Sequence, residues 1–187
     1  MPSRPTLLAQ HNKQTDMDLI PSFAVDHTNL PAGIYISRED LVGSEPVTTY
    51  DIRMTSPNRE PAIAPAAIHT IEHIVATYLR NHPEWKDSIV YWGPMGCLTG
   101  NYLILKGKPS PEELRPLMID AFQYVVDYEG QVPGATNANC GNYLMHDLPM
   151  AKWEAKRYIE RLKNDFHTEY NKAARAKSID GKEVFDA

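Results

Sequence analysis

The order of apolar and polar residues along the first half of the chain predicts a strand and then a helix. Residues 47–54 (VTTYDIRM) alternate between two faces, and Asp51 and Arg53 lie on the same face, as is typical of a half-buried strand. Across residues 65–82 the apolar side chains instead recur with the period of an amphipathic helix. Pro83 follows at once and ends this helix.

The second half of the chain predicts a hairpin followed by two more helices. Residues 89–92 and 102–105 are short apolar runs, separated by a glycine-rich turn that exposes Cys97. Helices are expected at about 110–128, where a serine, a proline and two glutamates form a start signal, and at about 149–170. Because the strands form hairpins, we expect an α+β fold with a mainly antiparallel sheet packed against helices.

Length and composition favour a single domain with polar ends. The chain has 187 residues, of which 42% are hydrophobic, enough for one core without disulfides. We expect a loosely ordered extension at 1–20, one catalytic domain at 21–164, and a helical end with a polar tail at 165–187. The first 20 residues lack the apolar run of a signal peptide, and no segment has the ~20 apolar residues of a membrane span. A cytoplasmic location is therefore expected.

Charge and cysteine content narrow the functional classes. The formal net charge is -5, with 19 Lys+Arg against 24 Asp+Glu, and no long basic segment, which argues against nucleic-acid binding. The chain has 2 cysteines, Cys97 and Cys140, which a reducing compartment keeps as thiols. A disulfide between them is the alternative.

The sequence His69-Thr-Ile-Glu72-His73 within the predicted helix indicates a metal site. Histidines four residues apart lie one turn apart on the same face, so both rings can reach one ion. Glu72 projects from that side, close enough to handle a proton, and Arg80 continues the same polar stripe. The alternative is a pair of surface histidines that have this spacing by chance.

The two cysteines add candidate ligands. Cys140 follows in a loop beside Gly141, and its thiolate is a strong third ligand that would leave one metal position open for chemistry. Cys97 admits two interpretations. As a fourth ligand it would close a Cys₂His₂ structural site, whereas as a free thiol of low pKa it would act as an acid or base beside the metal.

Several motifs, in this order and spacing, resemble the S-ribosylhomocysteine lyase (LuxS) family, whose members make the precursor of autoinducer-2. The motifs are PSFAVDH at 21–27, YDIR and PNR within 50–59, HTIEH at 69–73, PMGCLTG at 94–100, and CGNY and HDL within 140–148. The resemblance covers about residues 21–164. Two departures affect substrate contacts: Leu98 replaces a usually polar residue, and Tyr91-Trp92 replaces a pair that often begins with an acid.

The resemblance implies a role for nine residues. The metal ligands would be His69, His73 and Cys140. The general acid/base pair would be Glu72 and Cys97. The substrate pocket would be lined by Ser22, His27, Arg53 and Arg80. For the two arginines, the alternative is an ordinary exposed cation.

The resemblance also implies a reaction, a cofactor and a partner. The family cleaves the thioether of S-ribosylhomocysteine to homocysteine and 4,5-dihydroxy-2,3-pentanedione, through aldose–ketose isomerisations and a β-elimination with a divalent metal as Lewis acid. Iron(II) is expected in the cell, although two histidines and a thiolate also suit zinc or cobalt. A symmetric homodimer is expected, with the metal site on a helix and a loop at its interface.

Two other functions fit parts of the pattern. In a metallopeptidase of the inverted HxxEH class, Glu72 would activate water, and a downstream carboxylate would be the third ligand. A non-enzymatic protein would instead use both cysteines and both histidines to hold a structural zinc.

Overall fold

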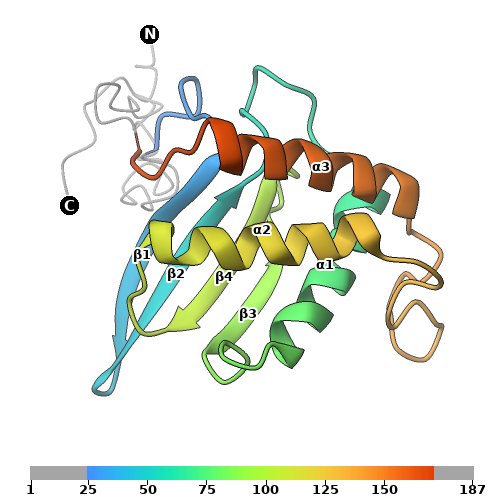
Figure 1. Ribbon diagram of the computed structural model, residues 1–187, viewed down its shortest axis with the longest axis horizontal. Helices are drawn as coiled ribbons and strands as arrows, with labels where there is room; N and C mark the ends of the chain where they lie inside the picture. Colours follow the sequence, from blue (N-terminus) through green and yellow to red (C-terminus); the bar gives the residue numbers. More distant parts are fainter. Residues whose placement is uncertain (1–24, 171–187) are drawn as a thin grey trace, which may run out of the picture.

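The computed structural model describes residues 25–170 as a four-stranded antiparallel sheet with three helices (Figure 1). The strands lie in the order β1-β2-β4-β3, so β2 and β4 are central. In chain order the elements are β1 (Gly33–Val42), β2 (Glu45–Arg53), α1 (Pro65–Asn81), β3 (Ile89–Pro94), β4 (Gly100–Lys106), α2 (Pro111–Asp127) and α3 (Leu148–Asn164). The predicted α+β class and the mainly antiparallel sheet are confirmed.

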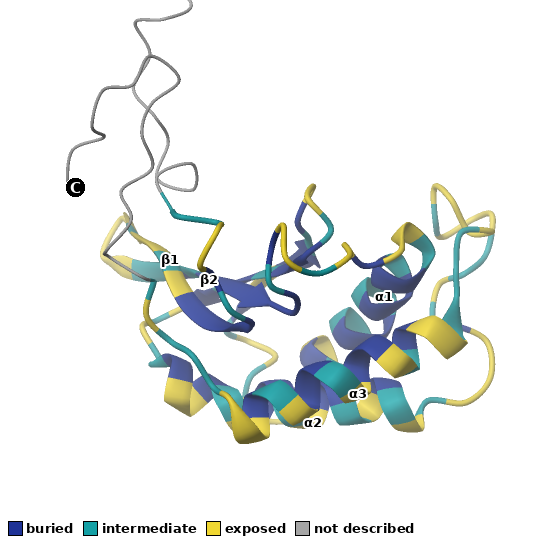
Figure 2. Cartoon of the chain, turned by 90° about the horizontal axis from the view of Figure 1, so that it is seen from above, coloured by how far each residue is buried: buried dark blue, intermediate teal, exposed yellow. Residues whose placement is uncertain are grey.

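The core lies between one face of the sheet and the helices. Helices α2 and α3 cross this face, and α1 packs against both of them and against β3 (Figures 1 and 2). Tyr50 and Ile52 of β2 are fully buried on this side, as the alternation predicted. They share the core with Phe122 of α2 and Tyr158 of α3, whose rings meet edge to face at a centroid distance of 4.8 Å.

Local sequence signals account for where the first two helices begin and end. Ser110 accepts a bond from the Glu113 backbone and Glu113 bonds back to Ser110, which completes a capping box at the start of α2. Pro65 occupies the first turn of α1, where a missing backbone N–H costs nothing. Helix α1 ends at Asn81, just before Pro83, as predicted.

Two elements differ from the prediction. Strand β1 was not predicted, because a bulge after Ile36 breaks its alternation and its outer half carries charged residues. Helix α3 ends at Asn164 rather than near Tyr170, because the following segment pairs with β1. The Ile34 N–H donates to the His167 carbonyl at 3.0 Å, which holds that segment in extended form. The predicted polar ends at 1–20 and 171–187 lie outside the described residues.

A glycine lets the two central strands meet closely beside the β3–β4 turn. Gly100 pairs with Arg53 at the start of β4, and a Cβ atom added to Gly100 would lie 2.2 Å from the Ile52 carbonyl oxygen. Such a contact cannot exist without moving the backbone of β2 or β4. The position of Arg53 therefore depends on this glycine.

We expect Gly100→Ala to lower the free energy of unfolding by about 1–3 kcal/mol, since the added methyl group forces the central strands apart. Urea unfolding followed by circular dichroism would measure the change. Gly96→Ala is the matched control, because no atom of the described residues lies within 4 Å of the Cβ it would add. An equal effect of both substitutions would contradict the steric explanation.

Candidate metal centre

Helix α1 buries one stripe and presents the other to a polar site, as the sequence predicted. Ile68, Ile71 and Val75 are buried in the core. His69 and His73 are half-buried on the other face, one turn apart, and their ring centroids lie 4.7 Å from each other. The helix therefore delivers two imidazoles to one place.

The segment between α2 and α3 folds over these rings and fixes their tautomers. The Nδ1 atom of His69 lies 2.8 Å from the Met145 carbonyl oxygen, and Nδ1 of His73 lies 2.6 Å from that of Pro133. A carbonyl oxygen only accepts, so both Nδ1 atoms carry their proton and donate it. Each ring is left with an Nε2 lone pair, which is the form that binds a metal ion.

A tight turn brings this segment close to α1. Gly134 adopts a φ of 68°, which favours glycine. A Cβ atom there would lie 3.5 Å from Nδ1 of His73, so the backbone runs directly beside the ring. This approach allows the Pro133 carbonyl to accept the histidine proton.

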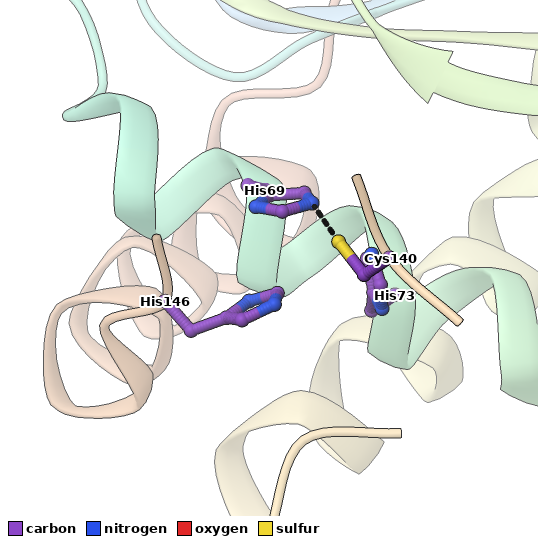
Figure 3. Close-up of side chains that lie close together, drawn as sticks. All are labelled: His69, His73, Cys140 and His146. Atoms are coloured by element: carbon purple, nitrogen blue, oxygen red, sulfur yellow. Dashed lines mark hydrogen bonds between the residues drawn. The ribbon is translucent and has the colours of Figure 1, made fainter. Parts of the chain in front are cut away.

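Cys140 from the same segment completes the predicted triad (Figure 3). Its Sγ atom lies 3.4 Å from Nε2 of His69 and accepts a bond from the Asn142 backbone. The candidate ligand atoms of His69, His73, Cys140 and His146 all lie within 4.8 Å of one another. The structure thus brings together the three predicted ligands and adds a fourth residue.

His146 was missed as a site residue, although it belongs to the HDL motif. Its Nδ1 atom lies 3.2 Å from the Thr70 hydroxyl, which already donates its proton to the Ala66 carbonyl. His146 must therefore donate from Nδ1, which leaves a lone pair on Nε2, a buried atom with no hydrogen-bond partner among residues 25–170. Burial and then the nearby imidazoles of His69 and His73 lower the pKa of His146, which favours this neutral ring.

This donor set fits a divalent transition metal. Three imidazole nitrogens with free lone pairs and one sulfur match the preference of zinc, iron(II) or cobalt. Cys97 is not in the group, and both cysteines are free thiols. Cys140 and His146 thus join the two histidines of α1 in this group. A metallopeptidase of the HxxEH class would need a carboxylate in the group, and a Cys₂His₂ structural site would need Cys97 as a second cysteine.

Cys97 lies in the exposed turn between β3 and β4, beside a buried ion pair. Arg53 is 3% exposed and pairs with Asp51 at 2.6 Å, so the alternative of an ordinary exposed cation is wrong for Arg53. Its Nη1 atom lies 3.8 Å from Sγ of Cys97 and also donates to the Thr99 hydroxyl. The Thr99 oxygen lies 3.1 Å from the same sulfur.

These neighbours change the acidity of Cys97. Partial burial raises the pKa of Cys97, but hydrogen bonds with Thr99 and the positive charge of Arg53 outweigh it, and the pKa falls below its ordinary value. The next residue, Leu98, has a φ of 58°, a conformation that costs a leucine about 1–2 kcal/mol. Backbone bonds from Leu98 to Met95 and Ile63 hold this strained turn in place.

The other predicted site residues lie in different settings. Glu72 is half-buried on α1, next to His73. Arg80 is exposed near the end of α1 and donates to the Val90 carbonyl at 3.2 Å. His27 is half-buried, with Nδ1 2.7 Å from the Val25 carbonyl oxygen, and Ser22 lies outside the described residues.

Comparison with known proteins decides the family. A family model described as "S-Ribosylhomocysteinase (LuxS)" matches residues 20–169, which include β1 to α3 and all four residues of the metal group. The chain belongs to the S-ribosylhomocysteinase (LuxS) family. The resemblance found in the sequence motifs is thereby confirmed.

Named relatives of the LuxS family support this assignment. The chain is 62% identical over 146 residues to an S-ribosylhomocysteine lyase from Phocaeicola vulgatus, covering 78% of this chain and 91% of that protein. It is 54% identical over 155 residues to one from Porphyromonas gingivalis, covering 83% and 97%. It is 48% identical over 148 residues to one from Clostridium acetobutylicum, covering 79% and 94%.

We expect Cys140→Ala to reduce bound metal to well below one ion per chain, because one of few ligands is lost and metal affinity falls at least about tenfold. Metal content after dialysis, measured by plasma emission spectrometry, is the test. Cys97→Ala is the matched control and should retain its metal, since Cys97 lies outside the group of four. Full occupancy in the Cys140→Ala protein would remove this thiol from the ligand set.

Proposed function

We propose that this chain is a metal-dependent S-ribosylhomocysteine lyase that forms homocysteine and 4,5-dihydroxy-2,3-pentanedione, the autoinducer-2 precursor. One observation carries the proposal: the LuxS family match spans residues 20–169, and within it two histidines of α1 converge with a thiol and a third imidazole from the α2–α3 segment. The reaction requires weakly acidic C–H protons to leave a sugar, and a Lewis acid beside proton-transfer groups meets that requirement.

His69, His73 and Cys140 are the proposed ligands, and His146 supplies a further donor beside them. A bound divalent ion would polarise a sugar oxygen as a Lewis acid. We take iron(II) to be the ion in the cell, with zinc or cobalt as substitutes that the same donors accept. The Nε2 lone pairs that His69 and His73 present to the group support their role as metal ligands.

Cys97 and Glu72 are the proposed proton-transfer pair. Sγ of Cys97 would take a proton from one sugar carbon and return it to the next. The Glu72 carboxylate would transfer protons to and from oxygen and carbon atoms on the other side of the sugar. The lowered pKa of Cys97 supports a base role, because more of the thiol is ionised at neutral pH. A proton on C4 can leave once C3 is a ketone, so homocysteine departs from C5 by β-elimination.

The substrate would be held by groups that the site already constrains. Arg53 is fixed by Asp51 and lies beside Cys97, which suits it to an oxygen of the sugar. Arg80, His27 and Ser22 are proposed to bind the remaining polar groups of the substrate. Arg80 is exposed, and its Nη2 donates to Val90, so its other N–H groups can reach a carboxylate.

We further propose a symmetric homodimer in the cytoplasm with the site at its interface. The sheet face away from the helices carries Tyr91, Tyr102 and Ile104, and Tyr91 is 46% exposed. No helix covers this face within the described residues, and its aromatic and aliphatic side chains are suited to contact a second copy (Figure 2). Both cysteines are free, as a reducing compartment requires, and none of the helices between residues 25 and 170 has the length and apolarity to cross a membrane.

We expect the anaerobic, metal-loaded protein to release a free thiol from S-ribosylhomocysteine. Cys97→Ala and Glu72→Gln should each lose at least about 100-fold in kcat while keeping the metal, because general acid–base groups contribute about 10²–10⁴-fold. Thiol release followed with a chromogenic disulfide would measure both. Near-normal turnover in either variant would exclude that residue, and no thiol release by the native protein would refute the lyase.

If each site draws residues from both chains, two inactive variants should complement each other. Mixed Cys97→Ala and His27→Ala chains would form heterodimers with one intact site, so part of the lyase activity should return after co-refolding. Sedimentation at micromolar concentration gives the oligomeric state. A fully active species of about one chain mass, 21.1 kDa, would rule out the dimer.

A further inference from the structure

Cys97 stands at the end of a chain of hydrogen bonds that crosses the sheet. The Tyr170 hydroxyl donates to Asp51 at 3.2 Å, and Asp51 accepts two bonds from Arg53, at 3.0 Å from Nε and 2.6 Å from Nη2. Nη1 of Arg53 donates to the Thr99 hydroxyl, whose oxygen lies 3.1 Å from Cys97 Sγ. Asp51, Arg53 and Thr99 are 2%, 3% and 6% exposed, so water cannot easily replace these bonds.

The guanidinium sets the direction of the last bond in the chain. Arginine has donors and no acceptor, so the Thr99 oxygen must accept the proton of Arg53. The single proton of the Thr99 hydroxyl is then free for an acceptor of its own, and Sγ of Cys97 lies within reach. A thiolate accepts such a proton far better than a neutral thiol does, so the arrangement favours ionised sulfur.

We propose that Thr99 is a positioning residue for Cys97: its hydroxyl, oriented by Arg53, holds the thiolate in the place from which protons are transferred. The use of that thiolate in catalysis rests on the proposed lyase function, whereas the hydrogen bond itself does not. Thr99 acts through the sulfur, because its hydroxyl lies between Arg53 and Cys97. Burial raises the pKa of Cys97, and the bonds with Thr99 lower it again.

The positive charge of Arg53 is an alternative explanation for a stabilised thiolate at Cys97, and it would not involve the Thr99 hydroxyl. Nη1 lies 3.8 Å from Sγ, a longer contact than that of Thr99, and a point charge neither selects a direction nor requires the hydroxyl. If charge were sufficient, removing the hydroxyl while keeping Arg53 in place would leave the thiolate unchanged. An isosteric substitution of Thr99 therefore distinguishes the effect of its hydrogen bond from the effect of the Arg53 charge.

The test is the pH dependence of Cys97 alkylation by iodoacetamide in the full metal-loaded chain, followed on the Cys97 peptide by mass spectrometry. We expect Thr99→Val to raise the midpoint by about one pH unit, and Thr99→Ser to restore it, because a hydrogen bond to a charged group is lost and regained. In lyase assays, the acidic limb of kcat/KM should move with the midpoint, and kcat should fall while KM changes little.

Thr55→Val is the matched control, since Thr55 is also buried, its backbone bonds to Thr99, and its hydroxyl has no partner in the part of the chain that the structure describes. An unchanged alkylation midpoint in Thr99→Val would overturn the inference, even if lyase activity fell, and so would an equal shift in the control. Thr99→Ala serves if the valine variant fails to fold. An inactive native protein would refute the lyase, and the alkylation midpoint would still decide the role of Thr99.

Discussion

Two hydrogen bonds from imidazole rings to backbone carbonyls hold the segment between α2 and α3 against α1. Residues 128–147 contain no helix or strand, so their position depends on such bonds, together with those that the Asp147 N–H donates to Ala66 and Thr70. The two imidazole bonds also aim the Nε2 lone pairs at the candidate metal position. The same bonds therefore fix the segment at 128–147 and orient His69 and His73 as ligands. A change that loosens this segment also misaligns the two imidazoles.

The Cys97 turn is supported in another way, by buried charge rather than by metal donors. Asp51 and Arg53 lie on the sheet face away from the helices and are almost fully buried. Two charges removed from water are stable only when their hydrogen bonds are satisfied, and the bidentate pairing with further bonds to Tyr170 and Thr99 meets that condition. The strain at Leu98 is tolerated because these contacts determine the turn from several sides.

Periodicity and capping residues were sufficient to predict α1, α2 and the β2 alternation, because these elements bury one regular stripe. Strand β1 could not be found in this way, since Tyr35 is buried on the face opposite to Ile34 and both faces of the inner half are covered. His69 and His73 were predictable from their spacing on one helix. His146 was not, because its role depends on a tautomer set by Thr70, 76 positions away in the chain.

The long separation between these partners has a consequence for the order of assembly. His73 and Pro133 are 60 residues apart, and Thr70 and Asp147 are 77 apart, with β3, β4 and α2 between them. Closing such long loops costs chain entropy before the new contacts compensate for it, so we expect these bonds to form after the local helices and hairpins. The donor set is therefore expected to be among the last parts of the fold to form.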